Sequence, residues 1–302
     1  MAAWIDAFLP TFGLIALGIL LRRRLLTDPA VWAGMESLTY WVLLPALLAS
    51  SIATVNLREL PLGTMAVTIW STLAVATASA LVLGRMLGHG RAAMTSVVQG
   101  GIRFNNYTAF SISGGLYGAA GFAFGGIAAG LIVPCVQTIL TFVFVLSEGE
   151  RIRPARLARQ IVLNPLIAGC LAGFAFAAVG GMPPGIAPFA RSLGNAGLAL
   201  GLLCVGGGLA IGSLREAPLT QLLVGLQKLV AVPLLTLAVA RLVGLPPVPT
   251  AIAVITMAMP TATTSYVMAR ALGGDARLMA AIITLQHLAA VVTLPLWAAL
   301  LR

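Results

Sequence analysis

Two clusters of polar residues interrupt apolar segments of the sequence, one in each half of the chain. The first lies in GGIRFNNYTAFSISGG, where the amides of Asn105 and Asn106 offer both donors and acceptors. The second lies in ITMAMPTATTSYVM, where Pro260 removes a backbone donor and Thr261 and Thr263 carry hydroxyls. Within a membrane, a broken helix is tolerated only against protein or a water-filled cavity. Matched breaks in both halves therefore indicate a binding site.

The proline cluster also predicts which backbone groups face a ligand. Pro260 is expected to free the carbonyl of Thr256, four residues earlier. A second half-helix begins at the threonines, and a helix N-terminus favours an anionic group. The alternative is that these residues only join helices, as Asn, Thr and small residues often do in membranes. The symmetric placement of the two clusters favours a substrate site.

Ionisable residues inside apolar segments are costly and need a partner. Arg103, one turn before the first break, either meets an anionic substrate or reaches the membrane interface. Lys228 is expected to pair with a carbonyl or with Glu36 in a structural role. Gln286 and His287 lie near the middle of the last apolar segment, and proton coupling through the histidine stays open beside a structural role. Coupling to sodium or to protons is possible, but no residue pattern in the sequence supports either, and no cofactor or metal site is predicted.

The composition of the chain indicates which class of protein carries these side chains. Of the 302 residues, 60% are hydrophobic and 9% are charged, and the mean hydropathy is +1.02. Soluble domains are about 45–50% apolar and about 25% charged. These values exclude soluble globular, disordered and disulfide-scaffold classes and make the lipid bilayer the expected surroundings. The net charge of +10 is scattered through short loops, so nucleic acid is not an expected partner.

A helix needs about 20 apolar residues to cross a bilayer. Breaking the chain at charges and at Pro/Gly clusters gives ten such segments, which predicts an all-α integral membrane protein with ten transmembrane helices. Asp275 is expected to cap the last helix. The predicted limits are 4–21, 35–55, 63–84, 92–117, 119–147, 160–181, 189–212, 217–243, 249–272 and 276–301.

The basic residues predict the orientation of the chain. Twelve of the 18 Lys and Arg fall in loops on one side and four on the other, so the richer side is expected to be cytoplasmic. This predicts a multi-pass protein of the inner membrane with both termini periplasmic. The longest connection, residues 148–160 (EGERIRPARLARQ), is then a cytoplasmic linker between a repeat at 1–147 and a repeat at 161–302.

The two halves align with each other at an offset of 155 residues. Residues 36–48 and 191–203 share five of 13 positions at this offset. Five helices in each half is an odd number, so the repeats must insert with opposite orientation, as in secondary transporters. The same offset brings further residues opposite one another: Asn105 and Pro260, Thr108 and Thr263, Gly118 and Gly273.

The blocks RFNNYTAFSISGGLYGAAG, LQKLVAVPLL and PTATTSYVMARALGGDARLMAAIITLQHLAAVVTLPLW resemble the auxin efflux carrier family, including its bacterial members, over nearly the whole chain. The resemblance implies a 5 + 5 inverted repeat with scaffold and transport domains, each formed from both repeats. It implies that discontinuous helices 4 and 9 cross at the substrate site, on Asn105, Asn106, Pro260 and Thr261. The wider fold is shared with bile acid sodium symporters. The family often has a proline at the first crossover, whereas this chain has Phe104 followed by two asparagines.

These observations together predict a secondary carrier that exports or exchanges a small organic anion, such as a carboxylate, by alternating access. Asn105, Asn106, Thr261 and Thr263 would position the anion, and Arg103 would supply positive potential. By resemblance, helices 1, 2, 6 and 7 form the scaffold, and helices 2 and 7 are candidates for a homodimer contact.

Three alternatives remain beside this carrier. They are an ion-coupled symporter of the bile acid type, a passive channel and an intramembrane enzyme. The last is disfavoured because the acids lie mostly at segment ends and form no DxxD pair, so no enzyme activity is predicted. The sequence also has no GxxxxGKS or GxxxxGKT motif, which disfavours ATP-driven pumping.

Overall fold

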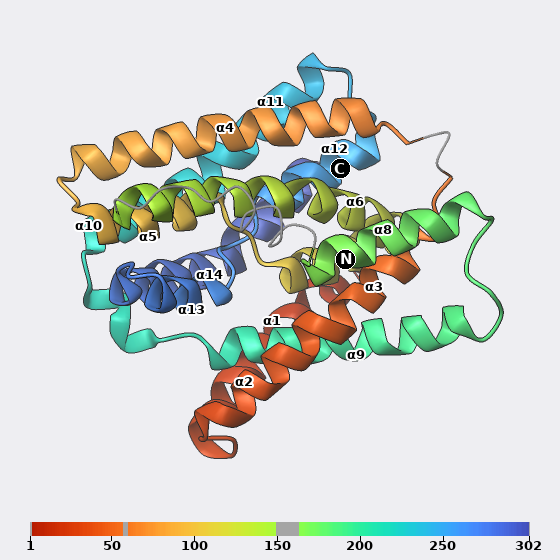
Figure 1. Ribbon diagram of the computed structural model, residues 1–302, viewed down its shortest axis with the longest axis horizontal. Coiled ribbons are helices and arrows are strands. Elements are labelled where there is room, and N and C mark those ends of the chain that lie inside the picture. The colour runs from red at the N-terminus through yellow and green to blue at the C-terminus, as the bar shows by residue number, and fades with distance from the viewer. Residues whose placement is uncertain (1, 57–59, 149–162, 302) are drawn as a thin grey trace. The chain divides into compact units, whose positions relative to one another are not determined.

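The computed structural model describes residues 2–56, 60–148 and 163–301 (Figure 1). In these ranges every regular element is a helix, which confirms the all-α class. All but the first residue of the predicted linker 148–160 lies outside the described residues. The first half contains α1 (Ala2–Arg24), α2 (Pro29–Leu38), the π-helix η1 (Thr39–Leu43), α3 (Leu44–Ile52), α4 (Leu62–Met86), α5 (Arg91–Ile102) and α6 (Asn106–Glu148). The second half contains α8 (Pro165–Ala178), α9 (Ile186–Gly207), the 3-10 helix η3 (Ile211–Arg215), α10 (Pro218–Leu226), the π-helix η4 (Gln227–Ala231), α11 (Val232–Leu242), α12 (Pro247–Met257), α13 (Thr264–Ala271) and α14 (Ala276–Leu300).

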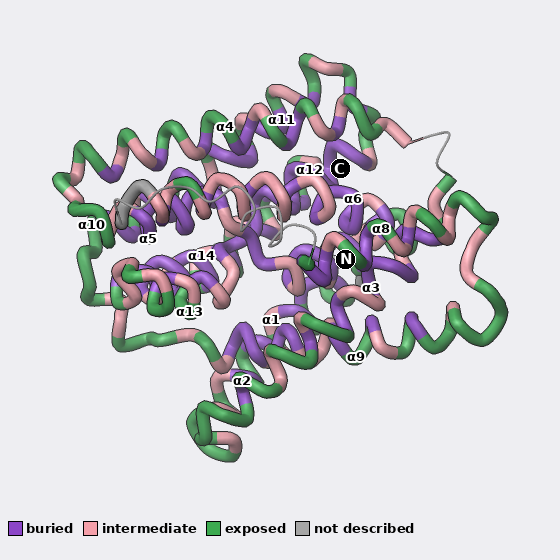
Figure 2. Tube along the Cα trace, in the orientation of Figure 1, coloured by how far each residue is buried: buried purple, intermediate pink, exposed green. Residues whose placement is uncertain are grey.

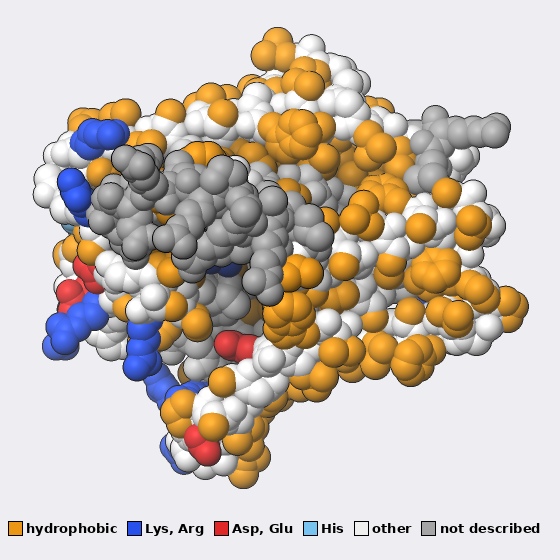
Figure 3. All heavy atoms as spheres, viewed as in Figure 1, with side chains coloured by type: hydrophobic (Ala, Val, Ile, Leu, Met, Phe, Trp, Pro, Cys, Tyr) orange, Lys and Arg blue, Asp and Glu red, His pale blue; other side chains and the backbone are white. Residues whose placement is uncertain are grey.

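Seven helical runs in the described part of the chain are long and apolar enough to cross a membrane. One of them, Arg91–Val145, covers 55 residues, and α8 and α12 are shorter apolar helices. Large hydrophobic side chains are exposed on many of these helices, and orange side chains cover much of the face shown in Figure 3. Apolar surface exposed on this scale requires lipid around it, so the chain is a multi-pass membrane protein.

Contacts divide the chain into two compact units, and each unit takes segments from both halves of the sequence. The first unit consists of residues 1–62, 106–133 and 158–208, and the second of residues 63–105, 134–157 and 209–302. Helix α6 begins in the first unit and ends in the second.

Glycines allow close helix packing inside the first unit. Helix α9 packs on α1 and α3, and α3 also packs on α8. Gly206 of α9 faces the carbonyl oxygen of Ile15 on α1 so closely that no Cβ fits between them. A Cβ on Gly169 of α8 would lie 2.7 Å from the carbonyl oxygen of Pro45. Small residues allow such backbone approach, which is the usual basis of helix association in lipid.

Helix α14 is the central element of the second unit. It contacts α5, α10, α12 and α13, and many of its residues are buried, as are all residues of α12 from Pro249 to Met257 (Figure 2). Pro233 cannot donate to the carbonyl of Leu229, and the indole Nε1 of Trp297 on α14 donates to that oxygen at 2.8 Å. The carbonyl of Leu229, which lies within η4, thereby receives a hydrogen-bond donor from α14.

Two helix boundaries follow local signals in the sequence. Gly118, at φ 56° and ψ −135°, breaks α6 at the boundary predicted between segments 92–117 and 119–147. Asp275 caps α14 as predicted, because its Oδ1 accepts from the backbone N of Leu278 at 3.0 Å.

Candidate functional site

The two predicted interruptions meet inside the second unit. Helix α5 ends at Ile102 and α6 begins at Asn106, whereas α12 ends at Met257 and α13 begins at Thr264. The backbone N of Asn105 donates to the carbonyl oxygen of Pro260 at 2.9 Å. Each break therefore satisfies a backbone group of the other, and we call this region the junction.

Gln286 of α14 joins the two sides of the junction. Its Nε2 donates to the carbonyl oxygen of Gly100 at 2.9 Å, and its Oε1 accepts from the backbone N of Thr261 at 2.8 Å. The hydroxyl of Thr261 donates to the same oxygen of Gly100 at 3.0 Å. Carbonyls in the last turn of a helix lack intrahelical donors, so Gln286 and Thr261 supply what the end of α5 is missing.

Lys228 satisfies the end of α12. Its side chain is fully buried, and its Nζ donates to the carbonyl oxygen of Met257 at 2.8 Å. In a continuous helix this oxygen would accept from Thr261, whose N–H is bound to Gln286 instead. Of the two partners predicted for Lys228, the structure shows the carbonyl.

The prediction that the carbonyl of Thr256 is free to face a ligand is wrong. The chain forms a turn after α12 in which the backbone N of Met259 donates to the carbonyl oxygen of Thr256, three residues earlier, at 3.3 Å. Pro260 still interrupts the helix, but the carbonyl that takes a side-chain donor is that of Met257.

His287 contacts the first break through Asn105. Its Nδ1 lies 2.8 Å from the carbonyl oxygen of Ile283, and a carbonyl can only accept, so Nδ1 carries the hydrogen. In the neutral ring Nε2 then accepts from Nδ2 of Asn105, which lies 3.4 Å away. Both side chains are buried. A residue that titrates near neutral pH when free in water thus lies against a predicted substrate residue.

Arg103 links the end of α5 to the start of α13. Its Nη2 donates to the hydroxyl of Thr264 at 3.0 Å, and its Nη1 lies 3.3 Å from Oε1 of Gln99 and 3.2 Å from Sδ of Met268. Gln99 was not among the predicted site residues. The available signal was its position four residues before Arg103 in an apolar helix, a spacing that places two side chains on one face.

For the remaining predicted site residues, Thr263 and Asn106, the structure shows no side-chain hydrogen bond to the junction among the described residues. Thr263 precedes α13 and makes no capping hydrogen bond through its side chain. The buried hydroxyl of Ser265 has no hydrogen-bond partner among the described residues, and the same holds for the Oδ1 of Asn106. Asn106 belongs to the first unit, so its pairing with Asn105 at one site stays a prediction.

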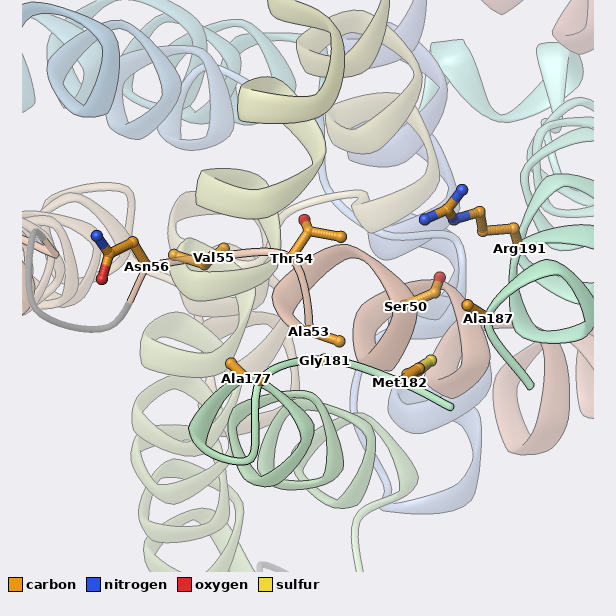
Figure 4. Close-up of a pocket in the computed structure, with 11 residues that line it drawn as sticks. Ser50, Ala53, Thr54, Val55, Asn56, Ala177, Gly181, Met182, Ala187 and Arg191 are labelled. Atoms are coloured by element: carbon orange, nitrogen blue, oxygen red, sulfur yellow. The ribbon is translucent and has the colours of Figure 1, made fainter. Parts of the chain in front are cut away.

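A separate pocket of about 440 Å³ lies within the first unit (Figure 4). The ends of α3 and α8 and the start of α9 form it, and the side chain of Arg191 extends toward Ser50. None of the predicted site residues is among its described lining residues.

The fold and the junction thus define a membrane protein with an internal polar site between broken helices. The family model described as membrane transport protein, that of the auxin efflux carriers, matches residues 151–298. The C-terminal half of this chain therefore matches that family of transporters, and the match confirms the resemblance for the two sequence blocks that lie within it, LQKLVAVPLL and PTATTSYVMARALGGDARLMAAIITLQHLAAVVTLPLW. None of the curated proteins matches the chain.

Proposed function

We propose that the protein is a secondary carrier of small organic anions, such as carboxylates, and that it works by alternating access with the substrate bound at the junction. One observation carries the proposal: a backbone hydrogen bond joins Asn105 and Pro260, one from each helix break, and both residues lie in the same compact unit. Membrane carriers use such breaks because they expose backbone and side-chain polar groups at the depth where substrate binds.

The charges at the junction favour an anion. The guanidinium of Arg103 lies at the N-terminus of α13, against the hydroxyl of Thr264. A helix N-terminus and an arginine both attract carboxylates, and here the two coincide. In this proposal Asn105, Asn106, Thr261 and Thr263 supply amide and hydroxyl groups to the substrate. The N-terminus of α13 and Arg103 would hold the carboxylate of the substrate, and the neutral amide and hydroxyl groups would discriminate between substrates with different substituents.

The proposal includes ten membrane crossings in a 5 + 5 inverted repeat. Two aligned glycines support it, because Gly118 and Gly273 both adopt positive φ, at 56° and 65°, just after a half-helix. The helices also pair into ten runs when α2 is joined to α3, α5 to the first part of α6, α10 to α11, and α12 to α13. The proposal further includes periplasmic termini, as the distribution of basic residues predicts, location in the inner membrane, and a homodimer contact through the second and seventh of the ten crossings.

A second candidate, an ion-coupled symporter, is favoured by the contact between His287 and Asn105. Proton exchange at this histidine would change its hydrogen bonding to the proposed substrate residue. Uptake into proteoliposomes with and without an imposed pH gradient separates the two candidates. Acceleration by the gradient in the wild type, lost in His287→Gln, supports the symporter. Equal rates with and without the gradient favour the uncoupled carrier.

The substrate class is tested by the thermal stability of the purified protein against a panel of mono- and dicarboxylates. The variants are Asn105→Ala/Asn106→Ala and, as a matched control, Asn195→Ala, which is exposed on α9 in the first unit. We expect at least one acid to stabilise the wild type and the control but not the double variant. Equal stabilisation of all three proteins would sink the site assignment, and no stabilisation by any acid would refute the anionic substrate.

A further inference from the structure

A pocket of about 390 Å³ lies within the second unit at the turn between α4 and α5. It is separate from the junction, and none of the residues assigned to the junction lines it. The last turns of α4, the connecting turn, the first turn of α5 and the C-terminal part of α6 form its wall. The proposed transport mechanism makes no use of this pocket.

Two arginines give the pocket a positive rim. Arg85 and Arg91 line it with exposed side chains, and neither makes a hydrogen bond or ion pair within the described residues. His89 also lines it, with its Nε2 2.8 Å from the hydroxyl of Thr220. None of the described lining residues is acidic. Unpaired arginines converging on one cavity are the usual recognition elements for phosphate or carboxylate groups.

The start of α5 adds a second attraction for an anion. This 12-residue helix begins at Arg91, and its N-cap is Gly90, which supplies no side-chain acceptor to the first turn. The N–H groups of an uncapped first turn carry partial positive charge and bind phosphate readily. Arg91 thus brings both its own charge and the end of its helix to the pocket.

The other wall of the pocket is apolar. Leu81, Met94 and Val143 line it. Arg85 lies in the last turn of α4, a helix long and apolar enough to span the membrane, so the rim lies where that helix leaves the hydrocarbon. A small soluble anion would use the rim alone. A molecule with a phosphate beside a hydrocarbon chain would use both walls.

We propose that this pocket binds an anionic phospholipid, with its phosphate held by Arg85, Arg91 and the first turn of α5, and an acyl chain lying against Leu81, Met94 and Val143. The site is independent of the proposed substrate. The proposal is therefore tested by lipid binding and not by transport.

The experiment titrates delipidated protein in neutral detergent with phosphatidylglycerol, phosphatidylcholine or inorganic phosphate and follows the bound lipid by native mass spectrometry and the Tm. We expect phosphatidylglycerol to bind most tightly. The affinity should fall about fivefold in Arg85→Gln or Arg91→Gln and roughly 30-fold in the double variant. The single variants keep the test usable if the double variant does not fold.

The matched control removes two exposed arginines elsewhere, in Arg191→Gln/Arg241→Gln, with the same change in net charge. Binding of phosphatidylglycerol by this control at wild-type affinity supports a specific site. Equal weakening in both double variants would show only bulk attraction and would overturn the proposal. Inorganic phosphate that raises the Tm as much as phosphatidylglycerol would also overturn it, because the apolar wall would then have no role.

Discussion

Replacing Gln286 with leucine is expected to destabilise the junction more than any other change to a single neutral side chain there. Gln286 is fully buried, and its amide makes one hydrogen bond to each broken helix, to Gly100 and to Thr261. Leucine has nearly the same volume, so the change removes the two hydrogen bonds without creating a large cavity.

The size of the effect follows from what each partner loses. The oxygen of Gly100 keeps the hydroxyl of Thr261, so its loss is one net hydrogen bond, about 0.5–1.5 kcal/mol. The buried N–H of Thr261 loses the acceptor shown for it, Oε1 of Gln286, which costs about 1–3 kcal/mol. The sum is about 1.5–4.5 kcal/mol, and at roughly 2 °C for each kcal/mol the Tm should fall by about 3–9 °C.

The assay is thermal unfolding of the purified protein in detergent. Gln137→Leu is the matched control, because Gln137 lies half-buried on α6 and its side chain has no hydrogen bond among the described residues. We expect the control to stay within about 1 °C of the wild type. A Tm for Gln286→Leu equal to that of the control would refute the account of how the two breaks are held together.

Three further predictions concern local packing and capping. Gly18→Ala should lower the Tm by several degrees, because the added Cβ would collide with the backbone of Leu203 at a cost of about 1–3 kcal/mol. Gly13→Ala is the control on the same helix, where the added Cβ meets nothing, so its Tm should be unchanged or raised. Equal Tm values for the two variants would contradict the packing of α1 on α9. Asp275→Ala should lower the free energy of unfolding by about 1 kcal/mol, because α14 loses its cap. Asp275→Asn should keep most of the stability, because asparagine also caps helices. Chemical denaturation measures both variants, and identical midpoints would argue against the cap. Thr261→Val should lower the free energy of unfolding by about 0.5–1.5 kcal/mol, because the hydroxyl bond to Gly100 is lost. Thr261→Ser should lower it less, since serine keeps the hydroxyl. The same denaturation assay distinguishes the two variants, and an equal loss of stability would show that the hydroxyl contributes nothing.

The local features of the site could be predicted because their signals are local. Pro260 removes a helical hydrogen bond and an Asn pair competes with the helical backbone, and the two clusters occupy matched positions in the two halves, so both breaks could be predicted from the sequence. Gly118 and Asp275 fixed helix boundaries for similarly local reasons. The all-α class followed from composition.

The partners at the junction could not be predicted because they are distant in the sequence. Gln286 reaches Gly100 across 186 residues, and nothing in a single sequence indicates which apolar helix presents its one amide to a broken end. The error at Thr256 has a related cause. The rule for proline identifies the carbonyl that loses its donor, but the conformation of the following turn decides which carbonyl remains open.

The central claim is that a small organic anion binds at the junction and is carried across the membrane. The most direct measurement is counterflow in proteoliposomes of the carboxylate that most strongly stabilises the protein, in the wild type, Asn105→Ala/Asn106→Ala and Asn195→Ala. The account predicts saturable uptake, accelerated by unlabelled substrate on the opposite side, in the wild type and the Asn195 variant and its loss in the double variant. Flux that rises linearly with concentration without such acceleration, or wild-type counterflow in the double variant, would contradict it.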